Sequence, residues 1–491
     1  MASSPPVPEL AEPATACAER LVAADSVVLA SHIDADGLTS AAIAATALER
    51  AGIQFETVFS KQLDEAEIAA IAATDHDTAL FTDFGSGQLD IITDYEAAGD
   101  FTPVIADHHQ PADATTEYHL NPLLYGLDGA TELSGAGATY VLARALGMIR
   151  SATDGGVTAD APTTDEPARD NRDLAALAVV GAVGDRQAGV DGLTGANKAI
   201  VEEGVAAGVV EAGTDITLYG KQTRPLPKLL EYATEARIPG ISNDTAGAIE
   251  FLSGLDLALE TDDGWRCWVD LTDDERQTLL SALIQRAVAS GVPADRIDDL
   301  VGTSYQLSRE EPGTVLRDAS EFSTLLNATA RYERADVGLA VCLGDRKGAF
   351  DRAKTLLRNH RKNLSQGVDW VTSEGVTTED NLQWFDAGGE IRATIVGIIA
   401  GMAVGESGIR RDQPIIGFAE KSDTDLKVSA RGSHRLTAEG LDLSVVMRKA
   451  AHAVDGDGGG HDVAAGATIP AGNQEAFIAA AEELVGEQLS S

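Results

Sequence analysis

Four short segments of the sequence place carboxylates and imidazoles where a predicted strand ends or a predicted helix turns. Residues 31–37 read SHIDADG, residues 82–85 read TDFG, residues 106–109 read ADHH and residues 184–186 read GDR. Ligands of open α/β sheets bind at the carboxyl ends of the strands. A capping aspartate or a surface histidine is the simpler explanation of any one segment, but the four together predict one shared site.

The first segment carries His32, Asp34 and Asp36 at every second position. An extended strand points such residues to one side, so we expect three ligands to converge on one point. Asp83 stands alone at its strand end, which makes its carboxylate the candidate bridge between two ions about 3.5–4 Å apart. Carboxylates with a few imidazoles suit Mn²⁺ or Mg²⁺, so we predict a centre with two such ions.

The run Asp107-His108-His109, with an HxDxDG pattern before it and the isolated Asp185 beyond it, resembles the DHH phosphoesterase family. The resemblance covers residues 18–215, and the motifs occur in the family's order. It implies a hydrolase that cleaves phosphoester bonds with water activated by two metal ions.

The same resemblance implies a role for each side chain. Asp83 is implied as a ligand of both ions. The further ligands are His32 and Asp34 for one ion, and Asp36, His108 and Asp185 for the other. Asp107 and His109 are implied as catalytic residues that orient the ligating histidine and meet the scissile phosphate.

A glycine-rich segment near the C-terminus, residues 457–466, reads DGGGHDVAAG. Glycines let backbone amides approach a phosphate closely, although a plain turn explains such a loop equally well. Together with residues 429–433 (SARGS) in a predicted hairpin, the segment resembles the DHH-associated substrate-binding domain. That resemblance implies that nucleic acid is bound by four residues: Arg431, Gly459, Gly460 and His461.

Residues 346–362 invert the acidic balance of the chain, because basic side chains there face only Asp351 and the preceding Asp345. The basic residues are Arg346, Lys347, Arg352, Lys354, Arg358, Arg361 and Lys362. A solvated helix is the simpler interpretation. A surface that follows a chain of phosphates, with Arg358 and Arg361 as substrate-binding residues, fits better.

Hydrophobic patterns predict an α/β fold with a parallel-sheet metal domain, a helix-leaning middle segment and a smaller C-terminal α/β substrate-binding domain. The predicted domains span residues 18–215, 221–330 (intermediate or inserted) and 331–489. Strands are predicted at residues 26–31, 78–83, 103–107, 337–343 and 414–419. Helices are predicted at residues 37–50, 174–183, 350–363, 391–404 and 441–453. Residues 151–173, with almost no large apolar side chain, predict a surface loop.

The composition limits the protein's surroundings. The 491 residues carry a formal net charge of −41 and no apolar run long enough to span a membrane, and the N-terminus lacks a secretion signal, so we expect a cytoplasmic protein. The excess of acid is typical of proteins from salt-loving cells, and a basic partner is the alternative explanation. Three separated cysteines argue against a zinc site.

The length, the middle segment and the basic stretch favour a RecJ-like exonuclease that hydrolyses single-stranded DNA or RNA. In the archaeal branch of those nucleases the resemblance implies a possible partner, the replication complex GINS. Two alternatives stay open. One is an oligoribonuclease or cyclic-dinucleotide phosphodiesterase, for which residues 221–330 look superfluous; the other is a non-catalytic replication factor. The intact acids argue against the latter. A manganese pyrophosphatase is disfavoured by the GGGH loop.

Overall fold

The computed structural model covers most of the chain. The residues that it describes are 5–153, 170–233, 237–262 and 264–490. The surface loop predicted over residues 151–173 therefore lies largely outside the described residues. Two compact units divide the chain, Met1–Lys354 and Thr355–Ser491. Among the described helices, none is long and apolar enough to cross a membrane.

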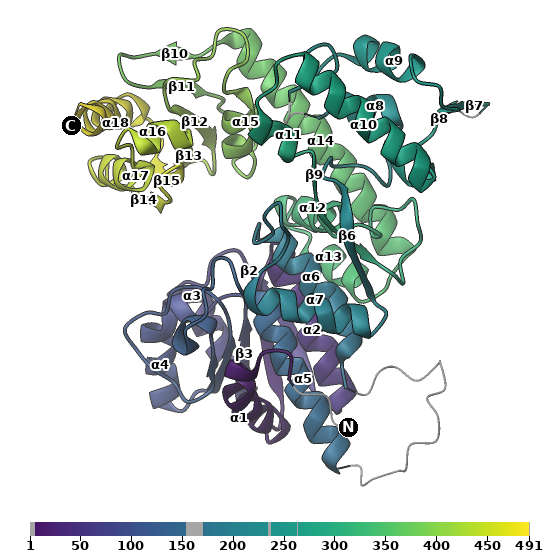
Figure 1. Cartoon of the computed structure of the whole chain (residues 1–491). Helices are drawn as coiled ribbons and strands as arrows, with labels where there is room; N and C mark the ends of the chain where they lie inside the picture. Colours follow the sequence, from purple (N-terminus) through teal and green to yellow (C-terminus); the bar gives the residue numbers. More distant parts are fainter. Residues whose placement is uncertain (1–4, 154–169, 234–236, 263, 491) are drawn as a thin grey trace. The chain divides into compact units, whose positions relative to one another are not determined.

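A five-stranded parallel sheet in the order β2-β1-β3-β4-β5 organises the start of the first unit (Figure 1). The strands are β1 (Val27–His32), β2 (Phe55–Ser60), β3 (Thr78–Thr82), β4 (Thr102–Ala106) and β5 (His119–Leu120). The central β3 is buried along its whole length, as a parallel strand covered on both faces must be. The strands predicted at 26–31, 78–83 and 103–107 are confirmed to within a residue at each end, and so is the α/β fold class.

Helices cover both faces of this sheet. On one face, Phe81 and Ile105 pack in a core that includes residues of α3 (Glu65–Ala72) and α4 (Leu89–Ala98). The other face is covered by α1 (Ala11–Val22), α2 (Ala35–Ala51) and α5 (Gly135–Thr153), against which α6 (Ala175–Gly184) and α7 (Gly195–Ala206) pack. The predicted helices 37–50 and 174–183 correspond to α2 and α6.

The middle segment is framed by two antiparallel strands, β6 (Val210–Ile216) and β9 (Val301–Leu307). Between them a helical subdomain buries Leu229, Trp268 and Leu283 in a core of its own. Its elements are α8 (Leu226–Glu231), α9 (Thr245–Ser253), β7 (Glu260–Thr261), β8 (Gly264–Trp265), α10 (Asp273–Ala289) and α11 (Ala294–Asp298). The helix-leaning character predicted for this segment is present.

Two helices follow, α12 (Ala319–Arg331) and α13 (Ala335–Cys342). The strand predicted at 337–343 is wrong, because these residues form α13. A short continuous apolar run fits a buried helix as well as a buried strand, and only the burial of Val337 and Val341 at helical spacing separates the two.

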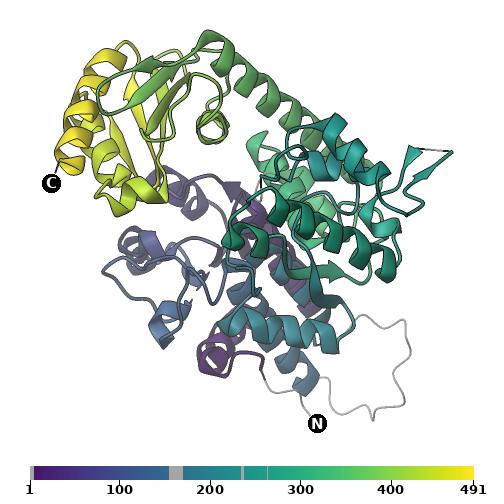
Figure 2. The same cartoon turned by 45° about the horizontal axis from the view of Figure 1, so that its top comes forward.

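The helix α14 (Gly348–Glu374) begins in the first unit and continues into the second. The second unit contains a six-stranded mixed sheet in the order β10-β11-β12-β13-β15-β14. Its strands are β10 (Thr377–Thr378), β11 (Gln383–Asp386), β12 (Ile415–Glu420), β13 (Asp425–Arg431), β14 (Asp457–Gly460) and β15 (Ala464–Pro470). Its other helices are α15 (Val396–Ala403), α16 (His434–Ala438), α17 (Leu443–His452) and α18 (Gln474–Leu489). Figure 2 shows the yellow C-terminal helices along one side of this sheet.

The predicted strand 414–419 and the hairpin around residue 429 are present as β12 and β13. The predicted helix 350–363 is part of α14, and the predicted helix 441–453 extends past α17 at both ends. The helix predicted at 391–404 starts only at Val396. The glycine-rich loop is in part an edge strand, β14, paired with β15. Glycine is required there because a Cβ on Gly458 would lie 2.7 Å from the carbonyl oxygen of Met447 on α17.

Candidate metal centre

The first acidic segment forms the turn between β1 and α2. The strand ends at His32, Asp34 is the N-cap of α2 with its Oδ1 accepting a hydrogen bond from Gly37 N at 3.0 Å, and Asp36 lies in the first helical turn. The expectation that an extended strand points all three side chains to one side is therefore wrong. They converge because the chain turns from strand to helix at this point.

Asp36 is almost completely buried, at 2% exposure. Its Oδ2 accepts a hydrogen bond from Gly135 N at 2.7 Å and its Oδ1 one from Ala136 N at 3.0 Å, so the carboxylate sits on the N-terminus of α5. Burial, followed by the charges of Asp83 and Asp185, raises the pKa of Asp36 well above its ordinary value. A bound cation would offset the repulsion between these carboxylates.

Asp83 directly follows β3 and adopts a left-handed backbone conformation with φ of 60°. Its Oδ2 lies 3.6 Å from His32 Nδ1 and its Oδ1 lies 3.4 Å from His108 Nε2. Burial tends to raise the pKa of Asp83, but His108 and His32 lower it overall. The buried Oδ1 has no hydrogen-bond partner among the described residues, and such an unsatisfied oxygen beside imidazole nitrogens fits a metal ion.

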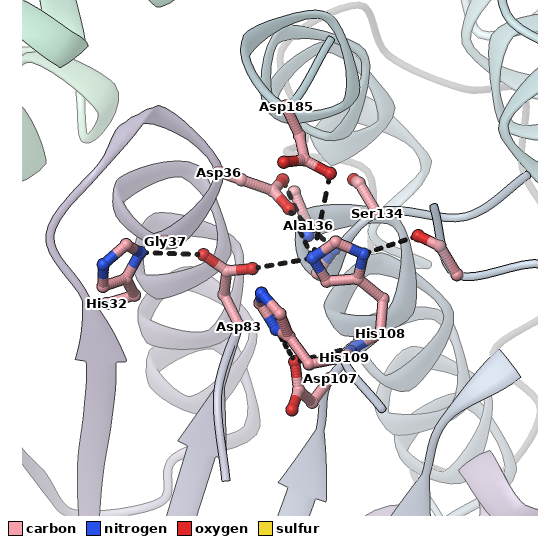
Figure 3. Close-up of polar contacts among 12 residues, drawn as sticks. His32, Asp36, Gly37, Asp83, Asp107, His108, His109, Ser134, Ala136 and Asp185 are labelled. Atoms are coloured by element: carbon pink, nitrogen blue, oxygen red, sulfur yellow. Dashed lines mark hydrogen bonds and ion pairs between the residues drawn. The ribbon is translucent and has the colours of Figure 1, made fainter. Parts of the chain in front are cut away.

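A hydrogen bond to a backbone carbonyl group orients the imidazole ring of His108, which lies among the acidic side chains of the site (Figure 3). Its Nδ1 donates to the carbonyl oxygen of Gly129 at 2.6 Å, which leaves Nε2 as the nitrogen that can bind a metal. Nε2 faces three carboxylates, at 3.4 Å from Asp83, 3.9 Å from Asp36 and 3.8 Å from Asp185, the C-cap of α6. The second, third and fourth acidic segments therefore meet the first at this nitrogen.

Asp107 is fully buried and fixes the DHH run itself. Its Oδ1 accepts hydrogen bonds from His108 N at 2.7 Å and from His109 Nδ1 at 2.8 Å, and its Oδ2 accepts one from Ser86 N at 2.9 Å. Burial opposes ionisation, but the bond from His109 and the nearby imidazoles lower the pKa of Asp107 to about 2. The same bond raises the pKa of His109, whose ring is half-exposed.

Among the described residues, three groups offer ligand atoms close enough to share one ion. The groups are His32 with Asp34 and Asp83, Asp36 with His108 and Asp185, and Asp83 with Asp107, His108 and His109. The structure thus brings together every residue predicted as a ligand. The division into two ions with Asp83 between them stays a prediction.

The sequence patterns missed the buried polar groups that hold these ligands. Asn121 donates from Nδ2 to the carbonyl oxygen of His109 and to Ser86 Oγ, each at 2.9 Å, and Ser86 Oγ lies 2.9 Å from His119 Nε2. Asn327 on α12 accepts a hydrogen bond from Ala35 N at 3.1 Å. The only sequence signal was the Asn-Pro pair after a short apolar stretch, which reads as an ordinary turn.

We expect Asn121→Ala to lower kcat by about 10–100-fold, because the backbone of His109 loses its anchor while no ligand is removed. Affinity for Mn²⁺, measured by calorimetry, should change little. Asn381→Ala serves as the control, since it removes an amide hydrogen bond to Glu482 in the second unit. A normal kcat in folded Asn121→Ala would contradict the positioning role.

The predicted substrate-binding residues lie elsewhere in the chain. Arg431 ends β13, Gly459 and Gly460 lie in β14, and the exposed His461 follows β14. On α14, Arg358 is exposed and Arg361 is half-buried. Two other basic residues near it are neutralised locally, Arg346 by Glu310 and Lys354 by Asp351. Because Arg431 and His461 belong to the second unit, a site shared with the metal centre stays a prediction.

Three domain families match separate parts of the chain. The DHH family, N-terminal domain, matches residues 26–178, the DHH-CID domain matches residues 218–301 and the DHHA1 domain matches residues 384–487. A relative, the uncharacterized protein MJ0831 of Methanocaldococcus jannaschii, is 29% identical over 467 residues, which are 94% of this chain and 93% of that protein.

Solved structures share the fold. RecJ in complex with Mn²⁺ from Thermus thermophilus aligns with a TM-score of 0.59 and 18% identity over 99% of this chain, which spans 56% of that RecJ chain. CDC45 from Entamoeba histolytica aligns with a TM-score of 0.62 and 12% identity over 97% of this chain and 98% of its own. At these identities the likeness shows the fold alone.

Proposed function

Because the chain belongs to the DHH family and has a RecJ-like fold, we propose that it is a phosphodiesterase that hydrolyses single-stranded nucleic acid from an end, with two Mn²⁺ or Mg²⁺ ions. The observation that carries this proposal is the metal centre. Three buried or half-buried acids face the Nε2 of His108, and Asp83 keeps an unsatisfied buried oxygen among them. Buried acids that repel one another destabilise the fold, so a protein without catalytic activity has no physical reason to keep them.

In this proposal His32, Asp34 and Asp83 hold one ion, and Asp36, Asp83, His108 and Asp185 hold the other. When bound, such ions supply an activated water and stabilise charge on the departing oxygen. The protein's own residues do the rest. Asp107 fixes the ring of His109, which positions this half-exposed imidazole to contact an oxygen of the scissile phosphate.

Two alternatives remain candidates. An oligoribonuclease or cyclic-dinucleotide phosphodiesterase would use the same metal centre, and the basic residues of α14 favour the longer substrate. A non-catalytic replication factor would use the same fold without its chemistry, but this chain keeps all the acids predicted as metal ligands. Association with GINS would be compatible with either a nuclease or such a factor.

The direct test is cleavage by purified protein with Mn²⁺ of end-labelled single strands, duplexes and dinucleotides, followed by product length. We expect single nucleotides or short products to be released from the end of a single strand, and no cleavage after chelation of the metal. Cleavage of dinucleotides alone would favour the small-substrate alternative. No cleavage of any substrate, by protein that binds Mn²⁺, would contradict the proposal.

The basic residues of α14 allow a second comparison. We expect the combined neutralisation of Arg352, Arg358, Arg361 and Lys362 to lower activity on strands of about twenty nucleotides far more than on dinucleotides, because a dinucleotide cannot extend along the helix. The salt dependence of strand binding should flatten by about 0.7 per lost phosphate contact. Equal losses on both substrates would make α14 an ordinary solvated helix.

A further inference from the structure

One face of the sheet in the second unit gathers positive charge. Strand alternation places Lys427, Ser429 and Arg431 on the same face of β13. Asp425, at the start of the strand, shares this face, and its carboxylate accepts hydrogen bonds from Ser422 and Thr424. The intervening Leu426, Val428 and Ala430 point to the opposite face, where they are buried in a core with residues of α17 and α18, such as Met447 and Phe477. The polar face of β13 is free of that core, but α15 packs on it beside Ser429 and Arg431.

On the side of β14 and β15 this face carries only small or polar side chains beside Lys427 and Ser429, whereas on the side of β12 it is covered by α15 and a core that includes Ile415. Gly466 on β15 pairs with Ser429, and Gly459 on β14 pairs with Gly466. A Cβ on Gly459 would meet nothing within 4 Å, whereas a Cβ on Gly466 would lie 3.1 Å from Lys427 Nζ. The ammonium group of Lys427 thus lies over the bare backbone of Gly466, beside open space at Gly459.

A second lysine joins the cluster from the turn after β12. Lys421 Nζ donates a hydrogen bond to Thr468 Oγ1 at 3.3 Å, and Thr468 pairs with Lys427 across the strands. Cross-strand partners share a face, so Lys421, Thr468 and Lys427 lie on the same side. Asp457 pairs with Thr468 from the other strand, but its carboxylate lies 3.7 Å from His452 Nε2.

No ion pair neutralises Lys427 within the part of the chain that the structure describes. No carboxylate of the described residues lies within 4.0 Å of its Nζ, although the chain has 78 acidic and only 37 basic residues. Burial, followed by the neighbouring Lys421 and Arg431, lowers the pKa of Lys427. Two lysines gathered over glycine residues of the sheet, with no carboxylate in contact with Lys427, indicate a site for an anion.

We propose that Lys427 and Lys421 bind a second phosphate of a nucleic-acid strand whose first phosphate is held by Arg431. This inference rests on the proposed function and specifies its substrate. The Cα atoms of Lys427 and Arg431 are four residues, or about 13 Å, apart along one strand, so a strand with several phosphates can contact both side chains at once. The polar face therefore selects substrates that carry several consecutive phosphates.

The test compares Lys427→Met and Lys421→Met with the intact full-length protein on a dinucleotide and on a strand of about twelve nucleotides. We expect KM for the longer strand to rise by about tenfold for Lys427→Met, the usual size of one charged hydrogen bond, and its kcat to stay constant. KM for the dinucleotide should change by less than about twofold. Lys427→Arg, which retains the charge, should restore most of the affinity.

Lys449→Met is the matched control, because Lys449 is an exposed lysine of the same unit on α17, which packs on the opposite face of the sheet. It should leave both substrates unaffected. An unchanged KM for the longer strand in both lysine variants, or an equal rise of KM for both substrates, would overturn the second phosphate site.

Strand binding, measured by fluorescence anisotropy in EDTA, separates this inference from the proposed function. If the wild-type protein binds the longer strand through Lys427 but cleaves nothing when Mn²⁺ is added, the phosphate site stands and the proposed nuclease activity fails. If the wild-type protein cleaves the strand and Lys427→Met binds it normally, the nuclease stands and the phosphate site fails. Competition by inorganic phosphate that is independent of Lys427 would also count against the site.

Discussion

Replacing Asp83 by alanine is expected to lower the hydrolytic activity by about two to three orders of magnitude. The two oxygens of the Asp83 carboxylate face different imidazoles, with Oδ2 3.6 Å from His32 Nδ1 and Oδ1 3.4 Å from His108 Nε2. Its removal should therefore disturb both halves of the metal centre together. Turnover with Mn²⁺, and Mn²⁺ binding by calorimetry, measure the two effects.

Asp90→Ala is the control for this variant, because Asp90 is an exposed aspartate in the first turn of α4, close to Asp83 in the sequence. It should retain normal turnover and normal Mn²⁺ binding. Circular dichroism confirms that each variant is folded. A folded Asp83→Ala protein with near-normal turnover would show that Asp83 does not bridge two ions and that the centre works in another way.

The types and order of the acids predicted which residues meet, but not how they do so. His32, Asp34 and Asp36 were expected on one side of a strand, whereas the strand ends at His32 and Asp36 lies within α2. Residues spaced two apart can converge either along one face of a strand or at a turn from a strand into a helix. Local sequence cannot separate these cases, because the turn depends on how α2 packs against α5 and α6.

The polar residues that hold the site from outside could hardly be predicted from the sequence. Asn121 and Ser86 act through single hydrogen bonds to the backbone of His109 and to each other, and neither belongs to a charged or periodic pattern. Asn327 reaches the site from a segment almost three hundred residues along the chain from its partner Ala35. Pairings of this kind follow from tertiary packing, which pattern and propensity do not encode.

The first residue of α5 limits the space around the carboxylate of Asp83. Gly135 begins this helix, and its backbone N–H donates to Asp36 Oδ2 at 2.7 Å. A Cβ on Gly135 would overlap Asp83 Oδ1 and lie 2.8 Å from Asp83 Cβ, an approach that no relaxed structure permits. The carboxylate of Asp83 cannot yield easily, because its backbone is held in a left-handed conformation by the bond from its N–H to the carbonyl oxygen of Ala106.

We therefore expect Gly135→Ala to lower kcat by about 100-fold and to weaken Mn²⁺ binding, although it removes no ligand and no hydrogen-bonding group. Alanine is the better helix former by up to about 1 kcal/mol, so the backbone of α5 itself gains from the change and overall unfolding is not the expected cause. Gly189→Ala is the matched control, because a Cβ there meets nothing within 4 Å. Normal turnover in Gly135→Ala would mean that Asp83 can move away without loss, and its exact position would then be irrelevant to the chemistry.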